Sequence, residues 1–230
     1  MIKENTIERI ENAVREVNRE VGKKSVGKSW KRLCENDLFA ELVSCIIGSQ
    51  ISFEKAKSAT ADLRQRNLLS VESFADELSD SENDIYSVLK EQGCLYSKAK
   101  ASYIVRSGRN IYSGRCNSLK NILLTAEDQY EARETLSDLC LGIGLKQASL
   151  FLRNIDYADN LAILDSHVIN YMGLLGMANG LKKSLTRTLY LSYEDELRSY
   201  SRKFNTSIAQ LDVSIWVVMR TVSREFKWML

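Results

Sequence analysis

Hydrophobic residues recur at helical spacing along most of the chain. In residues 6–20 the apolar side chains Ile7, Ile10, Val14 and Val17 follow one another at steps of three or four residues, with charged residues between them. This spacing places the apolar side chains on one face of an amphipathic α-helix. No segment alternates apolar and polar residues for long enough to require a β-strand. The pattern therefore predicts an all-α protein.

Residues that commonly cap helices divide the rest of the chain into further elements. Three caps predict helices at 37–47 from Asp37, at about 53–66 from Ser52 and at 82–91 from Ser81, and Ser97 starts a further helix that is rich in lysine and arginine. Later helices are expected at 127–139, 146–154, 166–175, 193–204 and 207–222. Gly173, Gly176 and Gly180 mark a loop region near 176–183.

Composition fits an ordinary globular protein of one large domain or two small ones. The chain has 230 residues, of which 44% are hydrophobic and 27% charged, and its formal net charge is only +2. A small net charge does not by itself indicate nucleic-acid binding. It does not exclude such binding either, because the charge of a whole chain can hide a local basic face. There is no proline, which helices tolerate better than sheets joined by tight turns. The first five residues contain no apolar signal region, and no apolar run approaches the ~20 residues of a membrane span. A cytoplasmic protein is expected.

The cysteines do not predict a metal site. Five are scattered along the chain, at Cys34, Cys45, Cys94, Cys116 and Cys140. Their spacing fits no zinc or iron–sulfur pattern, so reduced thiols are expected. The chain has a single histidine, which leaves no histidine pair for chelation.

The basic stretch 22–31 contains a P-loop-like spacing. Gly22 is followed by four residues and then by Gly27, Lys28 and Ser29. A P-loop follows a buried strand, whereas here a helix precedes the glycines. Nucleotide binding is therefore disfavoured.

A Gly-x-Gly turn in the middle of the chain is followed by two residues with possible catalytic roles. Residues 141–146 spell Leu-Gly-Ile-Gly-Leu-Lys between two expected helices, a helix-hairpin-helix arrangement. Such a turn at a helix start offers backbone N–H groups to a phosphate. Lys146 follows it, and Asp165 begins another expected helix nineteen residues later. An amine and a carboxylate beside a phosphate-binding hairpin are suited to cutting a glycosidic bond in DNA. The alternatives are a plain helix–helix corner, a solvated lysine and an ordinary N-cap.

The chain resembles the DNA glycosylases of the helix-hairpin-helix superfamily, most of all the type-2 8-oxoguanine DNA glycosylase/AP lyases. The resemblance covers roughly 35–230 and is carried by 141–149, 151–154, 161–168 and the spaced residues Leu211, Asp212, Trp216, Thr221, Phe226 and Lys227. It implies an all-α, two-lobed fold with the active cleft between the lobes. One lobe would be a helical barrel at 34–144 ending in the hairpin, and the other would combine 1–33 with 145–230. It also implies a monomer that acts on double-stranded DNA without a cofactor.

The resemblance assigns roles to several residues between positions 142 and 167. Lys146 would be the nucleophile that forms a Schiff base with the sugar. Asp165 would stabilise the positive charge that develops on the sugar. Backbone amides of Gly142, Ile143 and Gly144 would bind a phosphate. The resemblance also implies that the histidine, His167, contacts a phosphate beside the extruded nucleotide.

Three further roles follow more loosely from the resemblance. Gln50, in a segment like that of the endonuclease III branch, would fill the gap left by an extruded base; a helix end near the surface is the alternative. Trp216 would stack on that base, although its spacing also suits core packing. Lys227 would contact the damaged base, with Trp228, Met229 and Leu230 following it. Gln50 and Ser166 depart from the pattern of the type-2 enzymes.

Three functions remain open from the sequence. The first is a bifunctional glycosylase/lyase that removes an oxidised base, with 8-oxoguanine as the best candidate. The second is a glycosylase of the same fold for another modified base, such as an oxidised pyrimidine, which the Gln50 segment favours. The third is a non-catalytic helix-hairpin-helix DNA-binding protein. The joint presence of lysine and aspartate speaks against the third, because phosphate binding needs neither.

Overall fold

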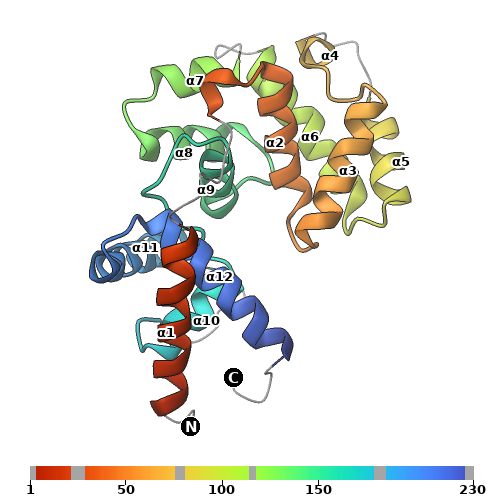
Figure 1. Cartoon of the computed structure of the whole chain (residues 1–230). Coiled ribbons are helices and arrows are strands. Elements are labelled where there is room, and N and C mark those ends of the chain that lie inside the picture. Colours follow the sequence, from red (N-terminus) through yellow and green to blue (C-terminus); the bar gives the residue numbers. More distant parts are fainter. Residues whose placement is uncertain (1–3, 22–28, 76–80, 114–117, 179–184, 226–230) are drawn as a thin grey trace. The chain divides into compact units, whose positions relative to one another are not determined.

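The described residues of the computed structural model are 4–21, 29–75, 81–113, 118–178 and 185–225. They form twelve α-helices and two short 3-10 helices and contain no β-strand, which confirms the predicted all-α class (Figure 1). No helix in these ranges has the length and apolar character to cross a bilayer. Residues 22–28 of the P-loop-like segment, as well as Gly180 and Lys227, lie outside the described residues.

The chain divides into two compact units. The terminal unit comprises 1–26 and 158–230, and the central unit comprises 27–157. These limits differ from the expected ones, because 27–33 and 145–157 belong to the central unit. The backbone N–H of Trp30 donates to the carbonyl of Ile155 over 2.8 Å, and this bond joins the two segments to each other. The whole hairpin, including Lys146, therefore lies in the central unit.

The terminal unit is built from both ends of the chain. Its elements are α1 (Glu4–Val21), α10 (Ser166–Leu174), α11 (Arg187–Ser201), the 3-10 helix η2 (Arg202–Phe204) and α12 (Ile208–Glu225). Figure 1 shows α1, in red, beside α12, in blue, and the two helices pack against each other. Ile10 and Val14 are buried, so the apolar face expected for 6–20 is the packing face of α1. Burying such side chains stabilises a fold by about 1.5–3 kcal/mol each.

The central unit is assembled around α2. Its elements are η1 (Trp30–Arg32), α2 (Glu35–Ile47), α3 (Phe53–Gln65), α4 (Val71–Ala75), α5 (Glu82–Glu91), α6 (Ser97–Tyr112), α7 (Leu119–Thr125), α8 (Gln129–Leu139) and α9 (Leu145–Asn154). Helix α2 is hydrophobic on most of its surface and packs against α3, α6, α7 and α9. A helix that is apolar nearly all round needs neighbours on every side, which explains its place in the centre of the unit.

The predicted helix starts were partly correct. Ser52 caps α3 as expected, since its side chain accepts a hydrogen bond from the Lys55 N–H over 3.2 Å. Ser81 stands at the N-cap of α5, but its side chain makes no capping hydrogen bond. Helix α11 begins at Arg187, before the expected residue 193, and Thr186 caps it. The short helices α4 and α7 were not predicted.

The prediction that Asp37 caps a helix was wrong. Helix α2 begins at Glu35 with Cys34 at its N-cap. Asp37 lies in the first turn, where its carboxylate accepts hydrogen bonds from the Cys34 thiol over 3.1 Å and from Arg64 over 2.7 Å. Both hydrogen bonds lower the pKa of Asp37, and the bond from Cys34 has the larger effect. A carboxylate in the first turn is also favoured by the helix dipole, so the residue type fits the region without being the cap.

Candidate functional site

The hairpin between α8 and α9 depends on two glycines in different ways. Gly142 has a φ of +77°, and a Cβ there would lie 2.6 Å from Cδ2 of Tyr103. Only glycine meets both conditions without strain. Gly144 has a φ of −105° at the N-cap of α9, and a Cβ there would meet no atom within 4 Å. Gly142 is thus required by the turn, whereas Gly144 leaves the start of α9 uncovered.

The start of α9 offers unpaired backbone donors. The N-cap provides no side-chain hydrogen bond, and the N–H of Ala148 donates to the carbonyl of Gly144 over 3.0 Å. The preceding N–H groups of the first turn have no partner within the helix. Such a cluster of N–H groups, together with the helix dipole, attracts an anion.

The three residues predicted to bind phosphate do not behave alike. Gly142 and Gly144 are exposed, while the side chain of Ile143 is buried. The Ile143 N–H also donates to the carbonyl of Cys140 over 3.3 Å within the turn. Ile143 therefore anchors the hairpin, and the two glycines form its accessible surface.

Helix α6 supports the hairpin from below. The hydroxyl of Ser107 accepts a hydrogen bond from the Leu141 N–H over 2.9 Å, and the Asn110 amide donates to the Leu139 carbonyl over 2.8 Å. The ring of Tyr103 lies where a side chain at position 142 would be. The turn is thus fixed by side chains of α6, none of which the sequence had singled out.

Lys146 is the second residue of α9 and is half-buried. Among the described residues, its amine has neither a recorded hydrogen bond nor an ion pair. Structural lysines that are half-buried usually place the amine beside an acceptor or a carboxylate, since a buried charge without a partner is costly. The amine of Lys146 is therefore available to a ligand at the start of α9.

Asp165 caps α10 in the terminal unit. Its Oδ1 atom accepts hydrogen bonds from the backbone N–H groups of His167 and Val168, both over 2.9 Å. The N-cap interpretation is thus confirmed, and it leaves no recorded partner for Oδ2 within the described part of the chain. The cap fixes the plane of the carboxylate, so one oxygen holds the helix while the other is free to act on a ligand.

Two buried carboxylates hold the extended segment that leads to Asp165. Oε1 of Glu194 accepts from the Ala162 N–H over 2.8 Å, and Oδ2 of Asp212 accepts from the Ile163 N–H over 2.9 Å. Both acidic residues are only 2% exposed. Carboxylates are buried at a high cost unless they are hydrogen-bonded, so their place here is specific. They position the backbone immediately before Asp165.

Sequence reasoning gave no role to either of these acidic residues. Asp212 belongs to the family pattern without an assigned role, and Glu194 lies outside that pattern. The available signal was an acidic side chain among apolar residues of a helix, as in Leu211-Asp212-Val213. That signal indicates burial, but it does not tell which backbone group the carboxylate meets.

His167 and Trp216 come together beside Asp165. Their rings lie edge to face, with centroids 6.5 Å apart, and the Arg220 guanidinium lies 4.9 Å from the Trp216 centroid. Nδ1 of His167 is buried and has no hydrogen-bond partner among the described residues. Buried polar atoms nearly always have a partner, so this atom points to a ligand. The terminal unit thus gathers three of the predicted residues.

Gln50 lies in the central unit just after α2. It is exposed and has a φ of +62°, so the interpretation as a helix end near the surface is confirmed. Lys146, the hairpin glycines and Gln50 belong to the central unit, while Asp165, His167 and Trp216 belong to the terminal unit.

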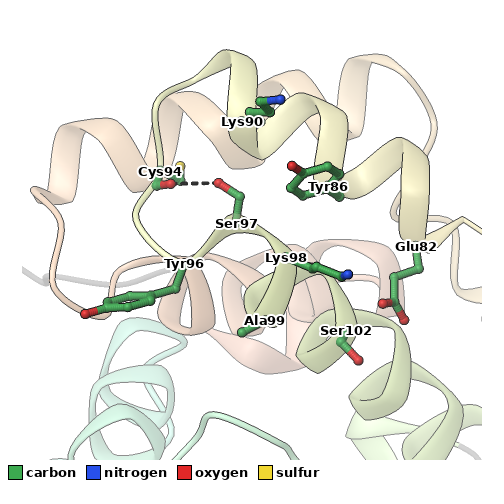
Figure 2. Close-up of a pocket in the computed structure, with 9 residues that line it drawn as sticks. All are labelled: Glu82, Tyr86, Lys90, Cys94, Tyr96, Ser97, Lys98, Ala99 and Ser102. Carbon is green, nitrogen blue, oxygen red and sulfur yellow. Dashed lines mark hydrogen bonds between the residues drawn. The ribbon is translucent and has the colours of Figure 1, made fainter.

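A pocket of about 700 Å³ lies at the start of α6 in the central unit (Figure 2). It is lined by Glu82, Tyr86, Lys90, Cys94, Tyr96, Ser97, Lys98, Ala99 and Ser102. Figure 2 shows the hydroxyl of Ser97 bonded to the carbonyl of Cys94 at its edge, a hydrogen bond of 2.7 Å. The predicted site residues do not line this pocket.

Comparisons with known proteins match the sequence motif and the fold. Residues 22–206 match a family model described as 8-oxoguanine DNA glycosylase. The chain is 35% identical over 181 residues to the 8-oxoguanine DNA glycosylase/AP lyase of Saccharolobus solfataricus, covering 77% of this chain and 80% of the relative. A relative from Korarchaeum cryptofilum with the same description is 29% identical over 201 residues, covering 87% of this chain and 88% of its own length.

Solved structures give the same picture. The 8-oxoguanine DNA glycosylase of Thermotoga maritima has a TM-score of 0.75 and 27% identity, over 94% of this chain and 96% of that one. The Methanocaldococcus jannaschii 8-oxoguanine glycosylase/lyase, solved with a 15mer DNA containing 8-oxoguanine, has a TM-score of 0.74 and 27% identity, over 93% and 95%. The resemblance inferred from the sequence is confirmed.

Proposed function

Because the chain belongs to the 8-oxoguanine DNA glycosylase family, we propose that it removes 8-oxoguanine from double-stranded DNA and then cleaves the strand as an AP lyase. The observation that carries this proposal is the amine of Lys146, which has no recorded partner among the described residues. It stands at the start of α9, directly after a turn whose N-cap makes no side-chain hydrogen bond. A DNA-binding module alone would need the turn but not the amine.

Lys146 is the nucleophile of the proposed reaction. The nitrogen lone pair of its amine attacks the anomeric carbon of the sugar, and the C–N bond to the base breaks with its electron pair leaving on the base. Loss of a proton from the nitrogen and opening of the sugar ring give an imine between Lys146 and the sugar. The imine acidifies the neighbouring carbon, so removal of a proton there expels the 3′ phosphate. Water finally releases the lysine.

Asp165 supplies the electrostatic part of the same reaction. Cleavage of the glycosidic bond passes through a state with positive charge on the sugar, which a fixed carboxylate stabilises. The cap bonds from His167 and Val168 hold the Asp165 carboxylate in one orientation before substrate arrives. A group that needs no reorganisation during the reaction is the more effective stabiliser.

The remaining residues bind DNA in the proposed complex. The accessible glycines of the hairpin take one phosphate without reading sequence. Nδ1 of His167, which has no hydrogen-bond partner in the described part of the chain, takes another. Trp216 offers an aromatic face for the extruded base, while Arg220 covers part of its ring. Gln50 fills the gap that extrusion leaves in the duplex, and Lys227 contacts the damaged base.

Trapping of the imine with borohydride tests the proposal. Duplexes that carry 8-oxoguanine, thymine glycol or an abasic site are incubated with the wild-type protein, with Lys146→Gln and with the control Lys98→Gln. Lys98 is an exposed lysine of the same unit that lies at the separate pocket. We expect wild type and Lys98→Gln to form a covalent complex with 8-oxoguanine and abasic DNA, and Lys146→Gln to form none while still binding DNA.

The outcomes separate the three functions. Trapping on thymine glycol but not on 8-oxoguanine DNA would mean a glycosylase for oxidised pyrimidines. Binding without any covalent complex would leave a helix-hairpin-helix DNA-binding protein. Strand cleavage by Lys146→Gln at the wild-type rate would remove Lys146 from the mechanism.

A further inference from the structure

The backbone at Gln50 is strained although the residue is exposed. Its φ of +62° lies in the left-handed region, which costs a residue with a Cβ about 1–2 kcal/mol. Among the described residues, no hydrogen bond of its side chain is recorded. The side chain therefore does not hold this conformation, and neighbouring contacts must impose it.

Lys100 of α6 provides those contacts. Its Nζ donates to the carbonyl oxygens of Ile47 and Ser49, both over 2.7 Å, and the residue is only 3% exposed. Ile47 is the last residue of α2 and Ser49 directly precedes Gln50. Burial lowers the pKa of Lys100, while the carbonyls at the C-terminal end of α2 are favourable partners for a cation.

The other side of the loop is held as well. Ser52 caps α3 through the Lys55 N–H, and the Lys55 amine donates to the carbonyl of Gly93 over 2.9 Å. Just beyond, the Ser97 hydroxyl bonds the Cys94 carbonyl and fixes the start of α6 (Figure 2). The loop at 48–52 is thus held by hydrogen bonds before and after Gln50, and the Gln50 side chain itself is exposed.

The same helix supports the hairpin. Tyr103 follows Lys100 by three residues in α6, so the two side chains leave the helix on the same side. Tyr103 packs under Gly142, and Lys100 holds the carbonyl before Gln50. Helix α6 therefore sets the distance between the Gln50 loop and the phosphate-binding hairpin, with both parts in the central unit.

We propose that Lys100 is a positioning residue that places Gln50 for insertion into the duplex when a base is extruded. The proposal rests on the proposed function and extends it to a residue that does not touch DNA. A lysine that only stabilised the end of α2 would lower stability without acting through Gln50, so coupling between the two residues separates the two roles.

A double-mutant cycle measures this coupling. Lys100→Met removes both hydrogen bonds with little change in side-chain length, Gln50→Ala removes the inserted group, and the third protein carries both changes. Lys98→Met is the matched control, because it removes an exposed lysine two positions earlier in α6. Single-turnover excision is measured on duplex DNA with 8-oxoguanine opposite cytosine. Borohydride trapping is measured on the same duplex with an abasic site, whose extrusion needs no unstacking of a base.

We expect each single variant to slow excision by about tenfold. The rate of the double variant should lie within about twofold of either single variant, because the two residues act together in one step. Trapping on abasic DNA should stay within about threefold of wild type, since unstacking of the lesion is not required. Lys98→Met should match wild type in both assays.

Two results would overturn the proposal. The first is an additive cycle, in which the double variant loses the product of the two single effects. The second is a Lys100→Met protein that excises 8-oxoguanine as fast as wild type. If Lys100→Met does not fold, Lys100→Gln takes its place in the cycle and the same comparison decides. A wild-type protein that forms no covalent complex with abasic DNA would instead refute the proposed function itself.

Discussion

The hairpin that carries Lys146 and the segment that carries Asp165 are stabilised in opposite ways. The hairpin is held through its backbone, by Ser107, Asn110 and the Tyr103 ring, and the Lys146 side chain has no recorded partner among the described residues. Before Asp165, buried carboxylates hold the backbone, and the Asp165 side chain itself is bound by two N–H groups.

This difference matches the chemistry proposed for the two residues. A nucleophile forms and breaks a bond with the substrate, so its side chain must be able to move. A carboxylate that stabilises charge acts best when it is already oriented. The protein therefore fixes the backbone beneath the amine, but it fixes both the backbone and the side chain of the acid.

Among variants that keep Lys146, the largest effect is expected from Asp165→Asn. Asparagine caps a helix about as well as aspartate, so the variant should unfold at nearly the wild-type temperature. Loss of the charge should slow base excision by about 10²–10³-fold, as for other groups that stabilise a charged transition state. Single-turnover kinetics with 8-oxoguanine DNA and thermal unfolding measure the two effects.

Asp128 is the matched control for this variant. It caps α8 in the central unit with Oδ1 accepting from the N–H groups of Tyr130 and Glu131 over 2.8 and 2.9 Å. Asp128→Asn should leave excision unchanged. Equal rates for the two variants would mean that Asp165 is only a cap.

Gly142→Ala tests the backbone side of the comparison. Alanine at a φ of +77° and 2.6 Å from the Tyr103 ring should destabilise the protein by about 3 kcal/mol, from left-handed strain and overpacking together. Urea unfolding measures the loss. Gly144→Ala has a normal φ and free space, so it should cost only about 1 kcal/mol, because alanine is a poorer N-cap than glycine. Similar stability for both variants would contradict the assigned roles of the glycines.

Asp212→Asn tests whether the carrier of Asp165 needs its buried acid. An amide oxygen is a weaker acceptor for the Ile163 N–H, and its NH₂ group must find a partner in a buried place. We expect a loss of about 2 kcal/mol in unfolding free energy, together with slower excision at temperatures where the protein is fully folded. Asp195→Asn, at an exposed position on the neighbouring helix α11, should change neither quantity, because surface ion pairs contribute little. A slower but equally stable Asp195→Asn protein would remove the special role of the buried position.

The smallest effect concerns Cys140 at the start of the hairpin turn. Burial raises the pKa of its thiol from 9.0 to about 12, so the folded protein keeps the proton that the unfolded chain loses. The resulting stability is complete below pH 9 and is lost as the pH rises toward 12. Between pH 8 and pH 10 we expect wild type to lose roughly 1 kcal/mol more than Cys140→Ala does in urea unfolding. Equal slopes for wild type and Cys140→Ala would contradict this contribution of the buried thiol.

Much of the helical order could be predicted from the sequence. The amphipathic face of α1, the cap at Ser52 and the two helices of the hairpin follow from local spacing and local capping chemistry. Such features depend on residues within a few positions of one another, and the backbone responds to them directly. The predicted start of α2 was wrong because Glu35, Asn36 and Asp37 are all residues found at helix starts. The local sequence does not determine which of them begins the helix.

The candidate catalytic residues, Lys146 and Asp165, could likewise be identified from the sequence. The sequence determined that a Gly-x-Gly turn precedes Lys146 and that Asp165 starts a helix, because both depend on neighbours in sequence. Only the tertiary structure decided that Lys100 meets the carbonyls of Ile47 and Ser49, and that Asp212 meets the Ile163 N–H. These partners are brought together by helix packing across some fifty positions of the chain, and no local pattern of residues encodes which buried donor will meet which acceptor.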